Sequence, residues 1–285
     1  MGRGLRLILD ARSTAAFLAG HAPGAAHLPE AAWDARAAEL PARELAFETV
    51  GEDGADSARL AALLKARGFT NAIPASFGTL EDRSERGAAR AVLWRASPWL
   101  VECGARLPSR GRALDVACGS GRHAVWLAAR GLATWGCDRL PDALRRARAL
   151  AEAARTLDAD AEAHPRAELA FAVLDATRAL PWRAGAFDVI CGFRYLDRAL
   201  FPRLARLLAP GGWLVWETFT VEQLRFGKPR RPEFLLEHGE WERLCAGAEL
   251  ELVATREAIV APDGPALASV LARRPFSLGN TARSR

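Results

Sequence analysis

The feature that most constrains the fold of this chain is an apolar stretch that runs into a glycine turn and then into a helical pattern. It reads Ala113-Leu-Asp-Val-Ala-Cys-Gly-Ser-Gly-Arg-His123. Glycine tolerates backbone conformations that other residues resist, so Gly119 and Gly121 predict a tight turn that a ligand can approach closely. Asp115 lies inside the predicted strand, just before the turn. This order of elements is typical of folds that bind nucleotides at strand ends.

The acid at position 115 separates two classes of ligand. A dinucleotide would bring its pyrophosphate against the Asp115 carboxylate and be repelled, whereas a ligand with an ammonium group would be attracted. We therefore favour S-adenosylmethionine (AdoMet) over a dinucleotide. Gly119, Gly121 and Ala124 formally fit the dinucleotide pattern G-x-G-x-x-A, but that short pattern alone is a weak signal.

Strand-like and helical segments alternate from residue 113 onward. Strands are predicted over residues 113–118, 133–137, 169–174, 187–193, 213–219, 250–260 and 267–274. Helices are predicted over residues 122–130, 141–155, 198–208 and 240–247, and the last helix but one is stopped by Pro210-Gly-Gly212. The alternation predicts an α/β fold with a Rossmann-like, doubly wound sheet of seven mostly parallel strands.

Two acids lie where predicted strands end. Asp138 ends the second strand, close to the spacing at which an acid meets ribose hydroxyls. Asp175 ends the third strand, where it could accept a hydrogen bond from an adenine amine. Either acid alone could instead cap a turn or a helix. Together with the glycine turn, the two acids favour a nucleotide cofactor.

On these residues, the region from 91 to 276 resembles the class I AdoMet-dependent methyltransferases. The family's acidic-x-Gly-x-Gly-x-Gly signature stands here as Asp115-Val-Ala-Cys-Gly-Ser-Gly121, with Ala117 in place of the first glycine. The resemblance implies that Asp115 and the turn hold the methionine end, Asp138 the ribose and Asp175 the adenine. The predicted cofactor-binding residues are Asp115, Ala117, Cys118, Gly119, Gly121, Asp138, Arg139, Asp175, Ala176 and Phe193.

The predicted catalytic residues, Arg194 and Tyr195, follow the fourth strand, where an acceptor would enter over the methyl group. Arg194 could orient an anionic substrate, and Tyr195, the single tyrosine of the chain, could hydrogen-bond the acceptor. The alternative is that Tyr195 packs on the next helix and Arg194 pairs on the surface. The phrases Phe193-Arg-Tyr-Leu196, Glu217-Thr-Phe219 and Phe226-Gly-Lys-Pro-Arg230 resemble the tellurite-resistance-type branch.

The acceptor class is narrowed by motifs that the chain lacks. The Asn/Asp-Pro-Pro-aromatic motif of nucleic-acid amino methyltransferases does not follow the fourth strand. No aromatic-interleaved basic patch favours RNA, and no ligand cluster predicts a metal. We therefore expect a small-molecule acceptor. A non-catalytic AdoMet-fold binding protein is the alternative, and the acceptor atom, a general base and the oligomeric state stay open.

The first 79 residues resemble the rhodanese-like (sulfurtransferase) family. The match rests on Asp10-Ala-Arg-Ser13, Gly20-His-Ala-Pro-Gly-Ala-Ala-His27 and Ala62-Leu-Leu-Lys-Ala-Arg-Gly-Phe-Thr-Asn71. The family places its catalytic cysteine directly after the strand equivalent to Phe47-Glu-Thr-Val50, and this chain has Gly51 there. Three carboxylates follow, from Glu52, Asp53 and Asp56. Without a thiol and with these charges, the module is predicted to be a degenerate scaffold or docking domain.

The predicted organisation has four parts. They are a small α/β rhodanese-like domain lacking the catalytic cysteine over residues 1–79, a linker over 80–90, the methyltransferase domain over 91–276 and a disordered tail over 277–285. The net charge of +5 comes almost wholly from arginines spread along helices, which favours solvated faces over a nucleic-acid partner. The chain has neither a membrane-length apolar run nor a signal-peptide core, so we expect a cytoplasmic protein without a membrane partner.

Overall fold

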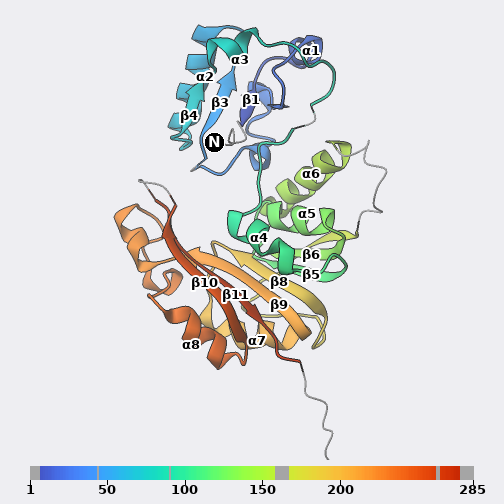
Figure 1. The fold of residues 1–285 in the computed structure, drawn as a ribbon, viewed down its shortest axis with the longest axis vertical. Helices are drawn as coiled ribbons and strands as arrows, with labels where there is room; N and C mark the ends of the chain where they lie inside the picture. The colour runs from blue at the N-terminus through green and yellow to red at the C-terminus, as the bar shows by residue number, and fades with distance from the viewer. Residues whose placement is uncertain (1–6, 44, 90, 158–166, 261–263, 277–285) are drawn as a thin grey trace, which may run out of the picture. The chain divides into compact units, whose positions relative to one another are not determined.

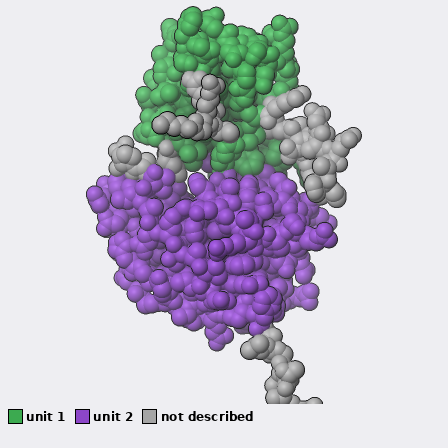
Figure 2. Space-filling view, in the orientation of Figure 1, with its two compact units in different colours: residues 1–95, 145–163 green, residues 96–144, 164–285 purple. Residues whose placement is uncertain are grey.

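The computed structural model describes residues 7–43, 45–89, 91–157, 167–260 and 264–276. Its contacts divide the chain into two compact units, residues 1–95 with 145–163 and residues 96–144 with 164–285 (Figure 2). The predicted tail over 277–285 lies outside the described residues. The domain boundaries expected at residues 79 and 91 stay a prediction. None of the described helices has the length and apolar character needed to cross a bilayer.

The first unit is built on a four-stranded parallel sheet with the order β2-β1-β3-β4 (Figure 1). Its strands are β1 (Ile8–Asp10), β2 (Ala25–His27), β3 (Phe47–Val50) and β4 (Ala72–Pro74). Its helices are α1 (Thr14–Ala19), α2 (Gly54–Ala66) and α3 (Phe77–Glu81). Leu9, Leu60 and Leu64 are fully buried because strand and helix bring their apolar faces together.

Two sequence-based predictions in this unit are wrong. Residues 20–29 are predicted as a loop, yet they contain β2, whose small residues carry no strand signal and are held by pairing with β1. Residues 31–40 are predicted as a helix, but they form two 3₁₀ turns, Glu30–Ala32 and Ala37–Glu39. The conformation of such a short helical segment is set by tertiary contacts. Here the Trp33 indole N–H donates a hydrogen bond to the Leu28 carbonyl.

The segment expected as a linker makes regular contacts within the first unit. The α3 helix runs into it, and the backbone groups of Glu85 and His21 exchange two hydrogen bonds. The N–H of Gly87 also donates to the carbonyl of Leu18. These bonds give residues 80–87 a defined path beside the start of the chain, although their composition is that of a loop.

The second unit contains a seven-stranded sheet with the order β10-β11-β9-β8-β5-β6-β7 (Figure 1). Its strands are β5 (Gly111–Val116), β6 (Leu132–Asp138), β7 (Leu169–Val173), β8 (Phe187–Phe193), β9 (Leu208–Phe219), β10 (Glu251–Ile259) and β11 (Ala266–Arg273). β11 runs antiparallel to both neighbours, and the other pairs are parallel. The helices of this unit are α4 (Pro98–Cys103), α5 (Arg122–Ala129), α7 (Phe201–Leu207) and α8 (Glu240–Gly247). The helix α6 (Pro141–Leu157) follows β6, and from residue 145 onward it is grouped with the first unit. The predicted fold class, a mostly parallel Rossmann-like sheet, is confirmed.

Alternate side chains of the central strands supply two cores, one on each face of this sheet. Leu114, Leu214 and Trp216 belong to the core that contains residues of α7 and α8. Val189 and Val215 belong to the core that contains residues of α4 and α5. Because successive residues of a strand point to opposite faces, a sheet covered on both sides must be apolar at nearly every position.

The pairing places the carboxyl ends of every strand of this sheet except β11 at one edge. β5 pairs with β6 on one side and with β8 on the other. The chain therefore adds strands first on one side of β5 and then on the other. Such a switch point leaves a crevice at the carboxyl ends of the strands, because the connections leave in opposite directions. The glycine turn after β5 lies at this place.

Two further predictions need correction. The apolar residues 91–100, with two tryptophans, predict a helix, but α4 begins only at Pro98, where Ser97 caps it. The Pro210-Gly-Gly212 turn was expected to separate a helix from a strand. Instead, α7 ends at Leu207 and β9 begins at Leu208, and the turn is a bulge between the pairs Phe187↔Leu208 and Val189↔Trp213. Gly211, with φ of 78°, permits this bulge.

The close approach of β8 and β9 gives a first test of the packing. A Cβ added at Gly192 would lie 2.6 Å from Cζ3 of Trp216, a fully buried indole. We expect Gly192→Ala to lower the free energy of unfolding by about 2 kcal/mol, because the core would be overpacked. Urea unfolding followed by tryptophan fluorescence measures this change.

The matched control is Gly247→Ala at the end of α8, where an added Cβ meets nothing within 4 Å. We expect that variant to be neutral or slightly stabilised, since alanine is the better helix former. Equal unfolding midpoints for the two variants would contradict the packing described.

Candidate functional site

The turn after β5 depends on left-handed backbone conformations. Ala117, Gly119 and Gly121 have φ of 53°, 53° and 77°. The Cys118 N–H donates to the Cys137 carbonyl at 2.9 Å, and the Gly121 N–H donates to the Cys118 carbonyl at 2.8 Å. Glycine adopts such angles freely, whereas alanine pays about 1 kcal/mol or more. Ala117 therefore adopts the left-handed conformation that the glycine of the signature would take, and its backbone is strained as a result.

Asp115, near the end of β5, supports the turn through a hydrogen bond to the start of α5. It is 1% exposed, its Oδ2 accepts the Ala124 N–H at 3.0 Å, and its Oδ1 accepts the Cys191 S–H at 3.6 Å. The first of these bonds ties the strand to the first turn of α5. Burial raises the pKa of Asp115 to about 7, and the charge of Asp138 adds to this. Asp115 does not line the cavity described below, so its contact with the methionine end stays a prediction.

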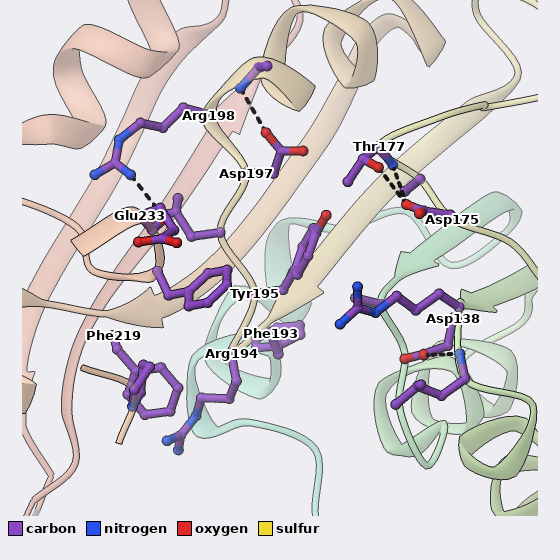
Figure 3. Close-up of a pocket in the computed structure, with 18 of the residues that line it drawn as sticks. Asp138, Asp175, Thr177, Phe193, Arg194, Tyr195, Asp197, Arg198, Phe219 and Glu233 are labelled. Atoms are coloured by element: carbon purple, nitrogen blue, oxygen red, sulfur yellow. Dashed lines mark hydrogen bonds between the residues drawn. The ribbon is translucent and has the colours of Figure 1, made fainter. Parts of the chain in front are cut away.

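Asp138 joins the glycine turn to the end of β6. Its Oδ2 accepts the Gly119 N–H at 2.9 Å, and its Oδ1 accepts the Leu140 N–H at 2.9 Å. It is 9% exposed and lines a cavity (Figure 3). A carboxylate has about four acceptor positions, so both oxygens can accept further hydrogen bonds from a ligand in the cavity.

Asp175 follows β7, and its carboxylate caps a turn, which is the alternative role considered for this acid in the sequence analysis. Its Oδ1 accepts the Thr177 hydroxyl at 2.7 Å and the Thr177 N–H at 3.0 Å. These bonds lower the pKa of Asp175, so the carboxylate is charged at neutral pH. Asp175, Ala176 and Arg139 nevertheless all line the cavity. Capping a turn and facing a ligand are therefore compatible at this position.

Phe193 and its neighbour His123 form an aromatic pair beside the turn. The two rings stack with centroids 3.8 Å apart and 20° between their planes. Burial, together with the charges of Arg122 and Arg194, lowers the pKa of His123 to about 3. The imidazole is therefore neutral and packs against Phe193, which itself lines the cavity.

Arg194 and Tyr195 leave β8 toward the cavity. Arg194 has φ of 59°, and its N–H donates to the Glu217 carbonyl at 2.8 Å. Tyr195 is half-buried, and its carbonyl accepts the Trp216 indole N–H at 2.7 Å. Burial raises the pKa of Tyr195 to about 12, so its hydroxyl is a hydrogen-bond donor at neutral pH. A non-glycine residue held at positive φ in a cavity wall is typical of a functional position.

The cavity that these residues share has a volume of about 860 Å³. Figure 3 shows Asp138 and Asp175 on one side and Phe219 and Glu233 on the other, with Tyr195 between them. Of the predicted site residues, the lining includes Ala117, Asp138, Arg139, Asp175, Ala176, Phe193, Arg194 and Tyr195. Four do not line it, and they form the strand end and turn behind it: Asp115, Cys118, Gly119 and Gly121.

Sequence reasoning missed the wall formed by residues far along the chain. Phe219 ends β9, and Pro229, Glu233 and Phe234 come from the segment before α8. Asp197 and Arg198 also line the cavity. Phe219 and Pro229 belong to phrases that carry the resemblance to the tellurite-resistance-type branch, but nothing local assigned them to the cavity. The proline-rich, aromatic segment directly after the fifth predicted strand is the signal that points to this wall.

No candidate metal centre accompanies the cavity. Within the described ranges, no group of three or more His, Cys, Asp or Glu side chains lies where it could hold an ion. The five cysteines are buried and unpaired as disulfides. Burial raises the pKa values of Cys118, Cys137 and Cys191, which keeps these thiols protonated.

The loop after β3 in the first unit is closed by its own side chains. The Gly51 N–H donates to Ser57 Oγ at 2.9 Å, and the Glu52 N–H donates to Asp56 Oδ2 at 3.0 Å. The Asp56 N–H donates to Asp53 Oδ1 at 2.8 Å. The backbone donors of Gly51, Glu52 and Asp56 are therefore engaged within the loop and are not directed at an anionic sulfur group.

The two histidines of the first unit are packing residues. The rings of His21 and His27 stack on Phe17, with centroids 3.8 and 4.5 Å away. His21 Nδ1 lies 3.0 Å from the Phe17 carbonyl, and His27 Nε2 lies 3.2 Å from the Arg12 carbonyl. Both imidazole rings therefore pack on Phe17 of α1 and contact backbone carbonyls beside it.

Two family models match the chain. Residues 113–212 match the model described as a methyltransferase domain, and residues 1–76 match the model described as a rhodanese-like domain. The cofactor of the methyltransferase family is AdoMet. No curated protein matches the sequence.

Solved structures give the same fold at low identity. A SAM-dependent methyltransferase from Methanosarcina mazei is 18% identical, with a TM-score of 0.50 over 64% of this chain and 100% of that chain. A magnesium protoporphyrin IX methyltransferase from Synechocystis PCC 6803 with bound SAH is 17% identical, with a TM-score of 0.48 over 62% and 78% of the two chains. A methyltransferase from Mesorhizobium loti is 18% identical, with a TM-score of 0.46 over 61% and 96%. The likeness to the Methanosarcina mazei structure, at 18% identity, shows the fold alone.

The raised pKa of Asp115 gives a pH-dependent prediction. The folded chain holds this proton more tightly than the unfolded chain, so the stabilisation is complete below about pH 4 and is lost as the pH rises through about 7. As the pH rises from 5 to 8, ionisation of Asp115 should lower the free energy of unfolding by about 2 kcal/mol. We expect Asp115→Asn to remove most of this pH dependence, as measured by urea unfolding at both pH values.

Asp34→Asn serves as the control, because Asp34 is an exposed surface acid. Its pH dependence should equal that of the wild type. A wild type and an Asp115→Asn variant with the same change between pH 5 and pH 8 would show that the buried carboxyl does not titrate in this range.

The closed loop of the first unit predicts that a cysteine alone does not restore sulfur transfer. A Cβ at Gly51 would lie 2.8 Å from the backbone carbonyl carbon of Asp56 and would also contact its carboxylate. We expect Gly51→Cys to show no thiosulfate sulfurtransferase activity above that of the wild type. Its thermal unfolding checks that the variant is folded, and measurable turnover by a folded variant would refute the closed-loop description.

Proposed function

Because the chain combines a class I methyltransferase domain with a rhodanese-like domain before it, we propose that it transfers a methyl group from AdoMet to a small molecule by direct displacement. The observation that carries this proposal is the hydrogen bond between the Gly119 N–H and Asp138. It joins the glycine turn and the acid at the end of β6 into one wall of the cavity. We also propose residues 91–276 as the catalytic domain, residues 1–79 as a scaffold and residues 80–90 as their connection.

The residues present fit AdoMet. Asp138 offers acceptor positions to two ribose hydroxyls, as argued above. Leu174 and Ala176 present apolar surface, and Asp175 presents a charged acceptor, where the adenine would lie. At Gly119 an added Cβ would meet nothing within 4 Å, so the turn leaves room for the methionine end. Cys118 and Gly121 would shape that turn, while Asp115 would hold it in place.

The chemistry divides between cofactor and protein. When bound, AdoMet would supply a methyl group on a sulfonium sulfur, so that an acceptor lone pair could bond to the methyl carbon while the carbon–sulfur bond breaks and the thioether leaves. The protein places the acceptor in line and excludes water, and positioning of this kind can contribute effective molarities of about 10⁵ M or more. Tyr195 would donate its hydroxyl proton to hold the acceptor, and Arg194 would orient a charged group.

His123 is neutral, but its position does not make it a general base for the acceptor. Its ring is stacked on Phe193 and is not among the residues that line the cavity. We therefore assign it a packing role. The acceptor must arrive with a reactive lone pair or lose its proton to solvent or to a group of the cavity itself.

The size and lining of the cavity favour a small acceptor. Its volume of about 860 Å³ lies in the range typical of small-molecule sites, which is about 300–1,000 Å³. The cofactor would fill the half between Ala117 and Ala176. The other half is bounded by side chains of β9 and of the segment 229–234, so the space that remains suits a compact molecule.

Binding of AdoMet is the first test. We expect calorimetry to show AdoMet binding to the wild type and a loss of at least about tenfold in affinity for Asp138→Ala, since that change removes the ribose contacts and releases Gly119. Asp188→Ala is the matched control. Asp188 also accepts a backbone N–H, that of Arg112 at 2.8 Å, and it does not line the cavity. Equal affinity of the two variants would contradict the assignment.

Methyl transfer is the second part of this test. The wild type is incubated with AdoMet labelled in its methyl group and a small-metabolite extract. We expect label in a small-molecule fraction and none with Asp138→Ala. Tight binding of NADH without binding of AdoMet would refute the proposal, and binding of AdoMet without transfer to any fraction would favour a non-catalytic protein.

A further inference from the structure

The cavity has an aromatic end away from the glycine turn. Tyr195, Phe219 and Phe234 line it from three different segments of the chain. Figure 3 shows Phe219 across the cavity from Asp138 and Asp175, with Tyr195 between them. Aromatic side chains are favourable contacts for a planar ring. This end lies beyond the positions assigned to the cofactor.

Arg194 is fixed at this aromatic end. Its backbone is held at φ of 59° by the bond from its N–H to the Glu217 carbonyl. Its guanidinium carbon lies 5.0 Å from the centre of the Phe219 ring, and its Nε lies 3.8 Å from Glu217 Oε1. The side chain is still 34% exposed and lines the cavity. A positioned guanidinium matches the geometry of carboxylate, sulfonate and phosphate groups.

Glu217 supports Arg194 from the interior. It is 5% exposed, and its carboxylate accepts hydrogen bonds from Ser97 Oγ at 3.2 Å and Ser269 Oγ at 3.1 Å. A buried carboxylate with two hydroxyl donors and a nearby guanidinium holds that guanidinium in one place. Such pre-organisation lowers the entropic cost of binding an anion.

The carboxylates at this end of the cavity have partners. Asp197 accepts the Ala199 N–H, Glu233 pairs with Arg231, and Glu240 pairs with Arg198. Two cations on either side of Pro229 differ from them. Lys228 and Arg230 are exposed, and within the described part of the chain neither forms an ion pair with a carboxylate. These two cations therefore add positive charge beside this wall.

From these contacts we propose that the acceptor is an anionic aromatic molecule. Its ring would lie among Tyr195, Phe219 and Phe234, and its anionic group would bind Arg194. Lys228 and Arg230 would attract it from solvent. This inference rests on the proposed function, because it assigns the part of the same cavity that AdoMet would leave open.

A pair of probes with one ring system tests the charge requirement. The full chain is saturated with S-adenosylhomocysteine, and 2-naphthoate and the neutral 2-naphthalenemethanol are titrated in by calorimetry. We expect naphthoate to bind at least about tenfold more tightly, the difference that one charge-assisted pair supplies. We expect Arg194→Gln to bind naphthoate no more tightly than the alcohol, with its affinity for the alcohol unchanged.

The cations beside Pro229 are tested with the double variant Lys228→Gln/Arg230→Gln. We expect a loss of about two- to fivefold in naphthoate affinity at low salt that disappears as the salt concentration approaches 0.5 M, because exposed charges are screened. Arg243→Gln on α8 is the control, since Arg243 is exposed and does not line the cavity. That variant should bind naphthoate as the wild type does.

The outcomes separate this inference from the proposed function. Failure of the wild type to bind S-adenosylhomocysteine would contradict the proposed function itself. If the cofactor product binds, the acceptor inference is overturned by equal affinity for the two probes, by binding of neither probe, or by an unchanged preference in a folded Arg194→Gln variant.

Discussion

The hydrogen bond from the Gly119 N–H to Asp138 is the interaction on which the site depends. It fixes the turn after β5 against the end of β6, and the second oxygen of Asp138 accepts the Leu140 N–H. Asp115 fixes the other side of the turn through the Ala124 N–H. The turn is thus held between two acids, one buried behind it and one in the cavity wall. The conformation of the turn is therefore fixed by hydrogen bonds within the chain.

Much of this site could be predicted from the sequence, because parallel strands bring their carboxyl ends to one edge. Asp138, Asp175 and Phe193 follow three different strands and line one cavity. The position of Asp115 was harder to foresee, since a strand sends alternate side chains to opposite faces and Asp115 faces α5. Of the three predicted acids, Asp138 and Asp175 therefore line the cavity, while Asp115 supports the turn.

What the sequence did not predict depends on contacts between distant segments. The strand β2 consists of small residues and exists because β1 pairs with it. The segment 229–234 completes the cavity although it comes about ninety residues after Asp138. Arg194 takes a left-handed conformation that no local pattern indicates, because its N–H is held by Glu217. The first unit shows the same dependence, since side chains from Asp53 to Ser57 close its loop.

The most direct measurement of the central claim is a crystal structure of the full chain with S-adenosylhomocysteine. The account predicts that the ribose hydroxyls bind Asp138, that the adenine lies beside Ala176 and that the thioether sulfur faces the end of the cavity lined by Phe193 and Tyr195. Finding the molecule elsewhere on the protein, or finding this cavity without it at a saturating concentration, would contradict the account.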